Sequence, residues 1–368
     1  MRNALLSFAA MGLSMSAITS ASSEEAASTI GAPVVTVENR SQLHSQQIFG
    51  RDATELLDRV DAEVKRVEGQ LVKLHFVAID SSMIDAARAA IDLRYGRSKP
   101  VVTCIVGQLA EGQARLGVDA IVALPEQYSS QSRVTDDRWG RVLTPGSRVY
   151  VSGQAEKANT PGEATRLTME SLQRTLQWLD SSLDDIVQVK AFVTPISAAD
   201  EVRAEFAMFV GGRNIPLVMV EWSSTLPIEI ELIAAAPSSA SSAPAVEYLT
   251  PPGMTASPIY CRVAKINAPE TIYVGGLVAA NLQTAEQEVT KIFGELKRLL
   301  AQSNSDLEHL VKATYYVASS DASSQLNALR PQYYASSRPP AASKAMVKSV
   351  GQSACNLTID MIAVRKQK

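Results

Sequence analysis

The amino-acid sequence predicts an α+β fold built from three tandem copies of one unit, each with the element order β-α-β-α-β-β. Two observations lead to this prediction. Runs that alternate apolar and polar residues, which are typical of strands, are separated by segments whose apolar residues recur every three and four positions, which is typical of amphipathic helices. This succession is clearest between Val149 and Ala236, and it recurs on both sides of that stretch.

The middle unit opens with a predicted strand at residues 149–154 that ends in Gly153-Gln154. A long helix follows, because Leu172, Leu176 and Leu179 fall on one helical face. The remaining segments are predicted as a strand, a short helix and two strands, at residues 186–193, 198–210, 217–222 and 228–234.

The C-terminal third repeats this order. A strand is predicted at residues 271–277, and Val289, Ile292 and Leu296 mark the face of the following helix. A strand at residues 310–317 and a helix that contains Asn327 come next. The segment Arg338–Lys344 then leads into a further strand, and the closing strand is placed at residues 358–364.

The N-terminal third is less regular, and chance similarity is the alternative explanation there. Its predicted elements are a strand, a helix, a strand, a helix and two strands, near residues 43–48, 56–67, 70–78, 84–95, 100–106 and 118–123. The three closing strands each carry one acid flanked by apolar residues, namely Asp119, Glu231 and Asp360. This shared pattern supports three copies.

The domain boundaries follow from these units and from composition. Residues 237–245 are rich in Pro, Ser and Ala, which favours a flexible linker. The predicted organisation is a signal peptide, a divergent first copy, a second copy, the linker and a third copy, at residues 1–21, 34–124, 128–236, 237–245 and 246–366.

The first residues are typical of an export signal. Arg2 is followed by an apolar stretch at 4–18 and by small residues at 19–21. A membrane anchor is the alternative, but the apolar stretch is short for a bilayer. We expect an exported protein, periplasmic or secreted, with no membrane span once the signal is cleaved.

Composition excludes several classes of function. The net charge is −3 and 20% of the residues are charged, so no basic surface for nucleic acid is expected. The three cysteines are too few for a disulfide framework, although one bridge is possible beside the alternative of buried free thiols. His44, His75 and His309 lack metal-site spacing, and no dinucleotide or phosphate-loop motif is present, so no metal and no cofactor are predicted.

The middle and C-terminal units resemble the RidA/YjgF family of reactive intermediate deaminases, parts of which carry the name endoribonuclease L-PSP. The resemblance rests on Ser152-Gly153-Gln154, on the strand at 187–193, and on Leu226-Pro227 followed by the strand at 228–234. It implies a chorismate mutase-like fold and a trimer with a cleft between each pair of subunits. Three copies in one chain then imply a monomeric pseudo-trimer that binds a small molecule in three non-equivalent inter-domain clefts.

The resemblance also implies roles for individual residues. The family's carboxylate-binding arginine has no counterpart, because Val102, Leu217 and Ala342 stand at its position. The family's water-activating carboxylate corresponds to Gly117, Glu229 and Thr358, so Glu229 is the predicted catalytic residue.

The remaining predicted site residues are implied by family position. Gly153 and Gly276, with Gln46 in the first copy, match the glycine whose backbone lines the pocket; tight packing is the alternative. Arg203 is a relocated cation or a solvated helix residue, and Trp139 or Tyr260 is a pocket wall or a core residue. The predicted substrate-binding residues are Ser152, Gly153, Gln154, Arg203, Gly276 and Asn327.

Two functions remain open from the sequence. One is an exported enzyme that hydrolyses reactive enamines or imines to ketones and ammonia without a cofactor. The other is a degenerate, non-catalytic binding module, which the missing arginine favours. An endoribonuclease is disfavoured by the low basic charge.

Overall fold

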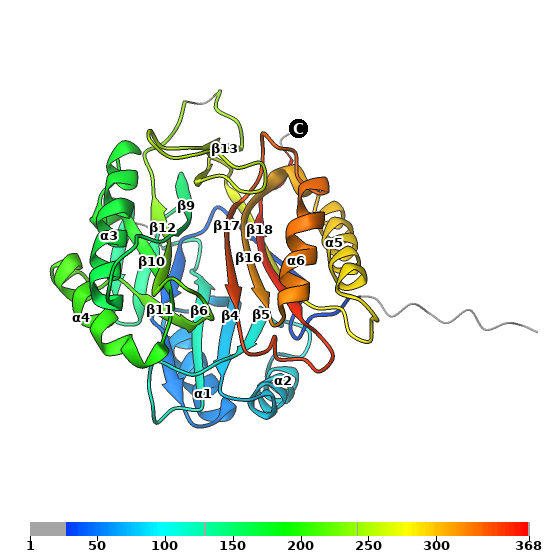
Figure 1. Ribbon diagram of the computed structural model, residues 1–368. Helices are drawn as coiled ribbons and strands as arrows, with labels where there is room; N and C mark the ends of the chain where they lie inside the picture. Colours follow the sequence, from blue (N-terminus) through cyan, green and yellow to red (C-terminus); the bar gives the residue numbers. More distant parts are fainter. Residues whose placement is uncertain (1–26, 129, 241, 367–368) are drawn as a thin grey trace, which may run out of the picture.

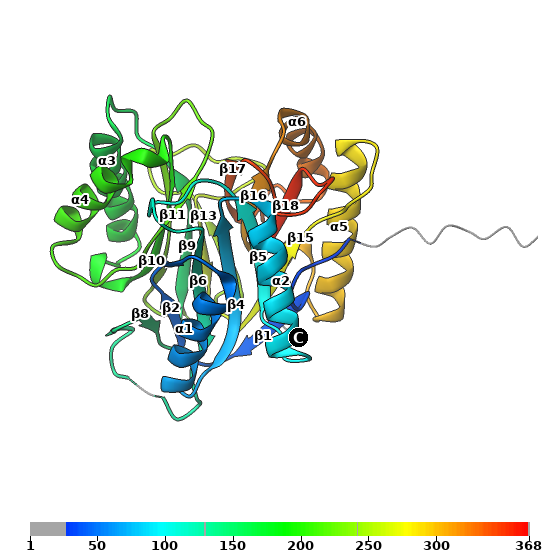
Figure 2. The same ribbon diagram turned by 90° about the horizontal axis from the view of Figure 1, so that it is seen from below.

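The computed structural model describes residues 27–128, 130–240 and 242–366 of the 368-residue chain. Three β-sheets face the centre of the molecule and three pairs of helices cover their outer faces (Figure 1). In the view from below, α1 and α2 lie in front of the sheets, with α3 and α4 on the left and α5 and α6 on the right (Figure 2). The expected α+β fold is therefore confirmed, whereas the predicted signal peptide lies outside the described residues.

The first sheet has the strand order β5-β4-β6-β2-β8-β7, and β3 pairs with β6. Helices α1 and α2 pack on its outer face. Its elements are β2 (Gln42–Ser45), β3 (Ile48–Gly50), α1 (Ala53–Arg66), β4 (Gln70–Ala78), α2 (Ser81–Tyr95), β5 (Val101–Val106), β6 (Leu116–Ala123), β7 (Val134–Asp137) and β8 (Gly140–Leu143).

The second sheet has the order β11-β10-β12-β9-β14-β13. Helices α3 and α4 cover it. Its elements are β9 (Arg148–Gln154), α3 (Pro161–Trp178), β10 (Ile186–Val193), α4 (Ala199–Val210), β11 (Leu217–Glu221), β12 (Ile228–Ala235), β13 (Val246–Leu249) and β14 (Val263–Ile266).

The third sheet has the order β1-β15-β18-β16-β17, with α5 and α6 outside it. Its elements are β1 (Val34–Glu38), β15 (Glu270–Leu277), α5 (Ala285–Gln302), β16 (Leu310–Val317), α6 (Ser320–Leu329), β17 (Ala341–Met346) and β18 (Leu357–Ala363).

All three sheets share one four-stranded arrangement. In each, a central strand pairs parallel with one neighbour and antiparallel with the closing strand. Each central strand also has an irregular register just before Lys73, Gln188 or Lys312, so these three residues are structurally equivalent. The N-terminal third therefore has the same sheet topology as the other two.

The first strands of each predicted domain cross to a neighbouring sheet. β1 pairs with β15 of the third sheet, the β7–β8 hairpin pairs with β2 of the first, and the β13–β14 hairpin pairs with β9 of the second. The predicted linker at 237–245 joins two strands of the same sheet rather than two sheets. Backbone hydrogen bonds thus tie the three units together around the molecule.

Local sequence explains the helices. Thr160 caps α3 by accepting a hydrogen bond from the Glu163 N–H, with Pro161 in the first turn. Thr284 and Gln287 form a capping box at α5. The predicted face of α3 is buried at Leu172 and Leu176 against the sheet. Within the described part of the chain, no helix has the length and apolarity needed to cross a membrane.

Candidate functional site

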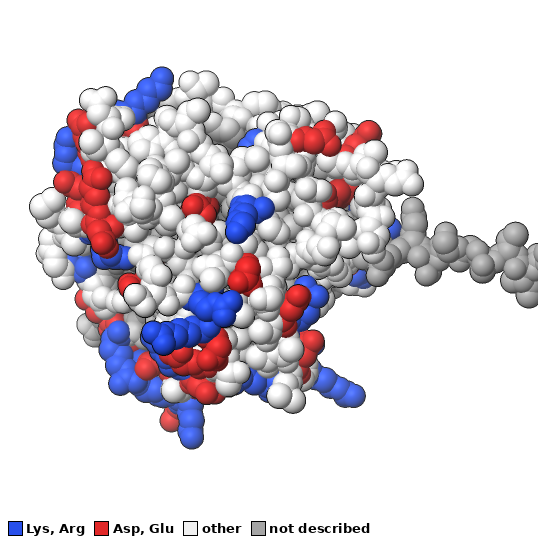
Figure 3. Space-filling model, turned by 60° about the horizontal axis from the view of Figure 1, so that its bottom comes forward, with Lys and Arg blue, Asp and Glu red and all other residues white. Residues whose placement is uncertain are grey.

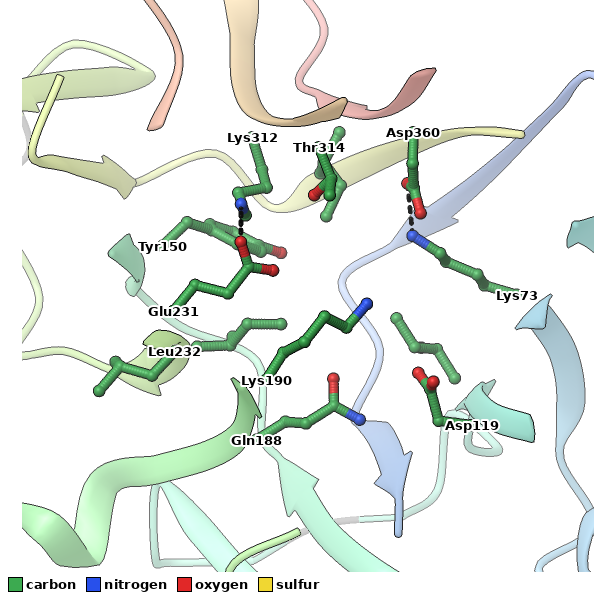
Figure 4. Close-up of a pocket in the computed structure, with 13 residues that line it drawn as sticks. Lys73, Asp119, Tyr150, Gln188, Lys190, Glu231, Leu232, Lys312, Thr314 and Asp360 are labelled. Carbon is green, nitrogen blue, oxygen red and sulfur yellow. Dashed lines mark hydrogen bonds and ion pairs between the residues drawn. The ribbon is translucent and has the colours of Figure 1, made fainter. Parts of the chain in front are cut away.

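A layer of charged side chains lies where the three sheets meet. Its lysines and acids come from the central and closing strands of all three units (Figure 4). Lys73 of β4 bonds Asp360 of β18 at 2.5 Å, and Lys312 of β16 bonds Glu231 of β12. Burial opposes the ionised forms of both acids, but their lysine partners hold each carboxyl pKa below its usual value.

The contact between the second and first units departs from this pattern. The equivalent residue there is Gln188, which donates to the backbone oxygen of Ser45 at 3.1 Å. Asp119 pairs with His75 of its own unit, Nδ1 to Oδ1 at 2.8 Å. Burial and nearby Lys190 lower the pKa of His75, so the neutral ring donates to Asp119 and accepts from the Tyr316 hydroxyl at 3.1 Å.

Lys190 points into a cavity of about 40 Å³ in this layer (Figure 4). Its ammonium makes no direct ion pair or hydrogen bond with another described residue, although Asp119, Glu231 and Asp360 raise its pKa against the effect of burial. Apolar clusters lie on either side of the layer, with Val72 and Ile362 in one and Phe192 and Tyr316 in the other. Charges of opposite sign balance in this layer, which is enclosed by apolar side chains.

A second cluster forms at the junction between the second and third sheets, which we call the β9–β17 junction. The Ser152 hydroxyl accepts from the Ala342 N–H at 2.7 Å, and the Gly153 N–H donates to Ser343 Oγ at 3.2 Å. A Cβ at Gly153 would lie 1.9 Å from Glu229 Oε1. Only glycine therefore leaves room for the Glu229 carboxylate where it stands.

Glu229 has an unusual environment at this junction. Burial and the neighbouring Glu231 raise the pKa of its carboxyl to about 7, against the opposing effects of Lys312, a side-chain hydrogen bond with Ser343, and Lys344. A carboxyl with this pKa is present in both protonation states near neutral pH, which is the property that acid–base catalysis requires.

The third sheet places an amine opposite this carboxyl. Lys344 of β17 is half-buried, and its Nζ donates to Ser323 Oγ at 2.9 Å and to Asn327 Oδ1 at 3.1 Å, both on α6. Burial and Arg330 lower the pKa of Lys344, while Glu229 raises it. The junction thus joins a carboxyl of raised pKa to an amine of lowered pKa from different sheets.

The structure brings together only some of the predicted site residues. Ser152 and Gly153 bond to β17, Glu229 lies against Gly153, and Asn327 bonds Lys344 of the same strand β17. Gln154 points the other way, because successive strand residues face opposite sides, and its Nε2 donates to Thr175 of α3 at 3.3 Å.

The other predicted residues line different junctions. Arg203 pairs with Asp200 and lines a pocket of about 270 Å³ with Gln46 and Phe49 of the first unit. Its guanidinium also donates to the backbone oxygen of Ala110 in the first unit at 3.4 Å, and among the described residues it forms no ion pair with Glu229. A Cβ at Gly276 would lie 3.1 Å from Thr103 Cα and from Thr358 Oγ1, at the contact between the third and first units.

The junction between the first and second units and the junction between the third and first units have no counterpart of the Glu229 carboxyl or of the Lys344 amine. Between the first and second units, Gln47 exchanges two hydrogen bonds with the Met219 backbone and lies against Gly117. The strand register therefore puts Gln47, rather than the predicted Gln46, at the place of Gly153. Between the third and first units, Gly31 packs against Pro100 and Val102. Lys344 has Cys104 and Met219 as its equivalents there.

Other sequence-based expectations have simple outcomes. Cys104, Cys261 and Cys355 are buried free thiols. Trp139 belongs to the core of the first unit, while Tyr260 stacks under the Arg262 guanidinium and directly precedes Cys261, whose N–H donates to Pro340. Among the described residues, no group of three or more His, Cys, Asp or Glu is placed to hold a metal ion.

Sequence reasoning missed Ser343, Lys344 and Arg330 as site residues. Each lies in the third unit, whereas the predicted site was assembled within the second. The available signal was the fourth strand of the third unit, where Ser343-Lys344 directly follows the position that lacks arginine.

A family model described as Endoribonuclease L-PSP matches residues 130–236 and 254–365. A YjgF family protein from Neisseria meningitidis is similar at 22% identity over 33% of this chain and 97% of its own, with a TM-score of 0.26. Yeast Mmf1 is similar at 25% identity over 34% of this chain and 98% of its own, with a TM-score of 0.25. Rv2704 of Mycobacterium tuberculosis, of the YjgF/YER057c/UK114 family, is similar at 27% identity over 26% of this chain and 83% of its own, with a TM-score of 0.24. No curated protein matches the chain.

Proposed function

Because this chain belongs to the Endoribonuclease L-PSP family, which includes the RidA/YjgF proteins, we propose that it hydrolyses reactive imines or enamines to ketones and ammonia. The observation that carries the proposal is Glu229. Its carboxyl has a pKa of about 7 and lies against the Gly153 backbone at the β9–β17 junction. No cofactor is needed for such a hydrolysis.

The chemistry assigns Glu229 three proton transfers. The ionised carboxylate accepts a proton from a water molecule as the water oxygen attacks the imine carbon. For a substrate bound as the protonated imine, the protonated carboxyl then returns the proton to the nitrogen of the resulting amino alcohol. The C–N bond breaks as the hydroxyl proton passes to the carboxylate, so ammonia leaves and the ketone remains. A pKa near the working pH suits all three steps.

An ammonia-release assay tests this proposal. The substrates are 2-imino acids and neutral imines generated during the assay, and the comparison is between the parent protein, Glu229→Gln and buffer. We expect the parent protein to accelerate ammonia release and the variant to lose most of the acceleration. No acceleration with any imine in the panel would refute the proposal.

A non-catalytic binding module is the second candidate function. Ala342 stands where the family resemblance implies an arginine, and the other two equivalent positions hold Val102 and Leu217. A ligand that binds without turnover, shown by calorimetry with the products of the imine panel, would favour this function. The low basic charge disfavours a ribonuclease, and one face of the molecule shows Lys and Arg interspersed with Asp and Glu (Figure 3).

We also propose that the first unit is a third, divergent family copy, and that the protein is an exported monomeric pseudo-trimer with its ligand bound between units. Strand pairing between successive units supports the monomer. Light scattering should give the mass of one chain, and a mass near three chains would contradict this. Recovery of the protein from the native cytoplasm with Met1 intact would contradict export.

A further inference from the structure

Lys344 differs from Lys73 and Lys312, the two lysines that bond an acid of another unit. Lys73 and Lys312 each bond a carboxylate, whereas the Nζ of Lys344 bonds two neutral oxygens, on Ser323 and Asn327. Among the described residues, Lys344 forms no ion pair. A half-buried ammonium without a paired anion is less stable than one in water, which shifts its protonation equilibrium toward the neutral amine.

A second cation crowds the same acceptor. Arg330 Nη2 donates to Asn327 Oδ1 at 3.2 Å, and Lys344 Nζ donates to this oxygen at 3.1 Å. Arg330 is 5% exposed and is held over the Tyr315 ring, with 5.0 Å between Cζ and the ring centroid. It therefore cannot move into water, and a fixed neighbouring cation is one of the recognised ways in which a protein activates a lysine as a nucleophile.

A proton-transfer group is also close. Glu229 acts electrostatically on Lys344, yet the two side chains make no direct ion pair. Gly153 and Ala342 are only partly buried and carry small or no side chains on this part of the junction. An amine, a carboxyl and two small residues therefore meet where a small carbonyl or imine compound would have both groups within reach.

We propose that Lys344 is a nucleophilic amine that forms a covalent imine with small aldehydes, ketones or imines bound at the β9–β17 junction. For a carbonyl ligand, the neutral Nζ bonds to the carbonyl carbon, the two protons that the nitrogen gives up pass to the carbonyl oxygen, and this oxygen leaves as water while the C=N bond forms. For an imine ligand, the same attack expels ammonia. Water then hydrolyses the lysine imine, which releases the ketone and regenerates the amine.

The carbonyl reaction is independent of the proposed function, whereas the imine reaction rests on it and places a covalent intermediate in it. Glu229 supplies the proton that the leaving water or ammonia needs. The equivalent residues Cys104 and Met219 offer no amine, so the reaction is confined to this junction among the three.

Reductive trapping tests the proposal directly. The full chain is incubated with pyruvate or propanal and a borohydride reductant, which converts a lysine imine into a stable secondary amine. Peptide mapping by mass spectrometry then identifies the modified lysine. We expect trapping at Lys344 at least about tenfold faster than at exposed lysines, since lysine nucleophilicity requires the deprotonated amine.

Three variants sharpen the experiment. Lys344→Arg should abolish the fast adduct, while Lys348→Arg, at an exposed lysine of the same chain segment, should leave it unchanged. Asn327→Asp keeps Lys344 but adds a carboxylate beside it, so the amine should hold its proton more tightly and trap about tenfold more slowly. This variant keeps the proposal testable if Lys344→Arg does not fold.

The outcomes separate this inference from the proposed function. Adducts spread evenly over surface lysines, or unchanged in Lys344→Arg, would overturn the inference. Ammonia release from imines without any Lys344 adduct would leave the proposed function standing and remove the covalent step. An adduct at Lys344 without ammonia release from any imine would support the nucleophilic lysine and contradict the proposed function.

Discussion

The central charged layer and the β9–β17 junction contain the same residue types but use them differently. In the central layer, Lys73 and Lys312 each bond an acid, and these acids have lowered pKa values. At the junction, Glu229 has a raised pKa and Lys344 a lowered one. The ion pairs of the central layer hold the three units in one arrangement. Glu229 and Lys344 form no ion pair, and the shifts of their pKa values toward each other allow them to exchange protons with a ligand.

The two regions are also connected. The Ser343 hydroxyl lowers the pKa of both Glu229 and Glu231, so one hydroxyl lies between the junction and the layer. Glu231 in turn raises the pKa of Glu229, because the two like charges are close. The Lys312–Glu231 ion pair is thus part of the environment that tunes the junction.

The largest effect is expected from breaking this pair. Lys312→Met leaves Glu231 as an unpaired charge in a nearly dry interior and should lower the free energy of unfolding by about 3–5 kcal/mol. Denaturant titration measures the loss. The double variant Lys312→Met/Glu231→Leu removes both charges and should recover most of it; equal destabilisation in both variants would contradict a role for the ion pair.

Glu229→Gln should act on activity and not on stability. The amide cannot accept a proton, so the rate of ammonia release should fall about 100-fold or more, the usual contribution of one acid–base group. The free energy of unfolding above about pH 7 should stay the same or rise, because the variant no longer buries a carboxylate. Full activity in the variant would remove Glu229 from the site.

Stability should fall as the pH drops from about 7 to about 5. Burial lowers the pKa of His44 to about 3 and also lowers that of His75. Below the ordinary pKa of about 6.5, the unfolded chain therefore binds protons that the folded chain does not bind. This costs stability at about 1.4 kcal/mol per pH unit for His44, and His75 acts in the same direction.

Glu229 acts in the opposite direction over this range. Its raised pKa makes the folded state bind the extra proton between about 4.5 and 7, which partly offsets the two histidines. Denaturant unfolding of the parent and of His44→Phe at both pH values measures the balance. The variant should show a shallower decline, and an unchanged decline would mean that His44 titrates normally in the folded protein.

The smallest effect is expected from Arg203→Ala. Arg203 is partly exposed and lies at the junction between the first and second units, away from Glu229. Its removal should change ammonia release less than about twofold and the free energy of unfolding by about 0.5 kcal/mol or less, as at other surface sites. A marked rise in the KM for the imine would place the active site at the Arg203 junction instead.

Local patterns in the sequence determined the elements of this protein. The strands Ile186–Val193 and Leu310–Val317 and the buried face of α3 lie where the alternation and the three-and-four spacing predicted them. These periodicities reflect which side of one element faces the core, and that property depends only on residues that are close in sequence. The motifs at Ser152-Gly153-Gln154 and 228–234 likewise led to the family that the comparison with known proteins supports.

Only the tertiary structure decided which units share their strands and which residues form the site. The strand β1 and the hairpins β7–β8 and β13–β14 cross to neighbouring sheets, because backbone hydrogen bonds between strands depend on which edge is adjacent in space and not on side-chain pattern. For the same reason, Glu229 lies at the junction that carries Lys344 and not at the one that carries Arg203. A contact between residues of different units depends on how whole sheets pack, and no local spacing in the sequence records it.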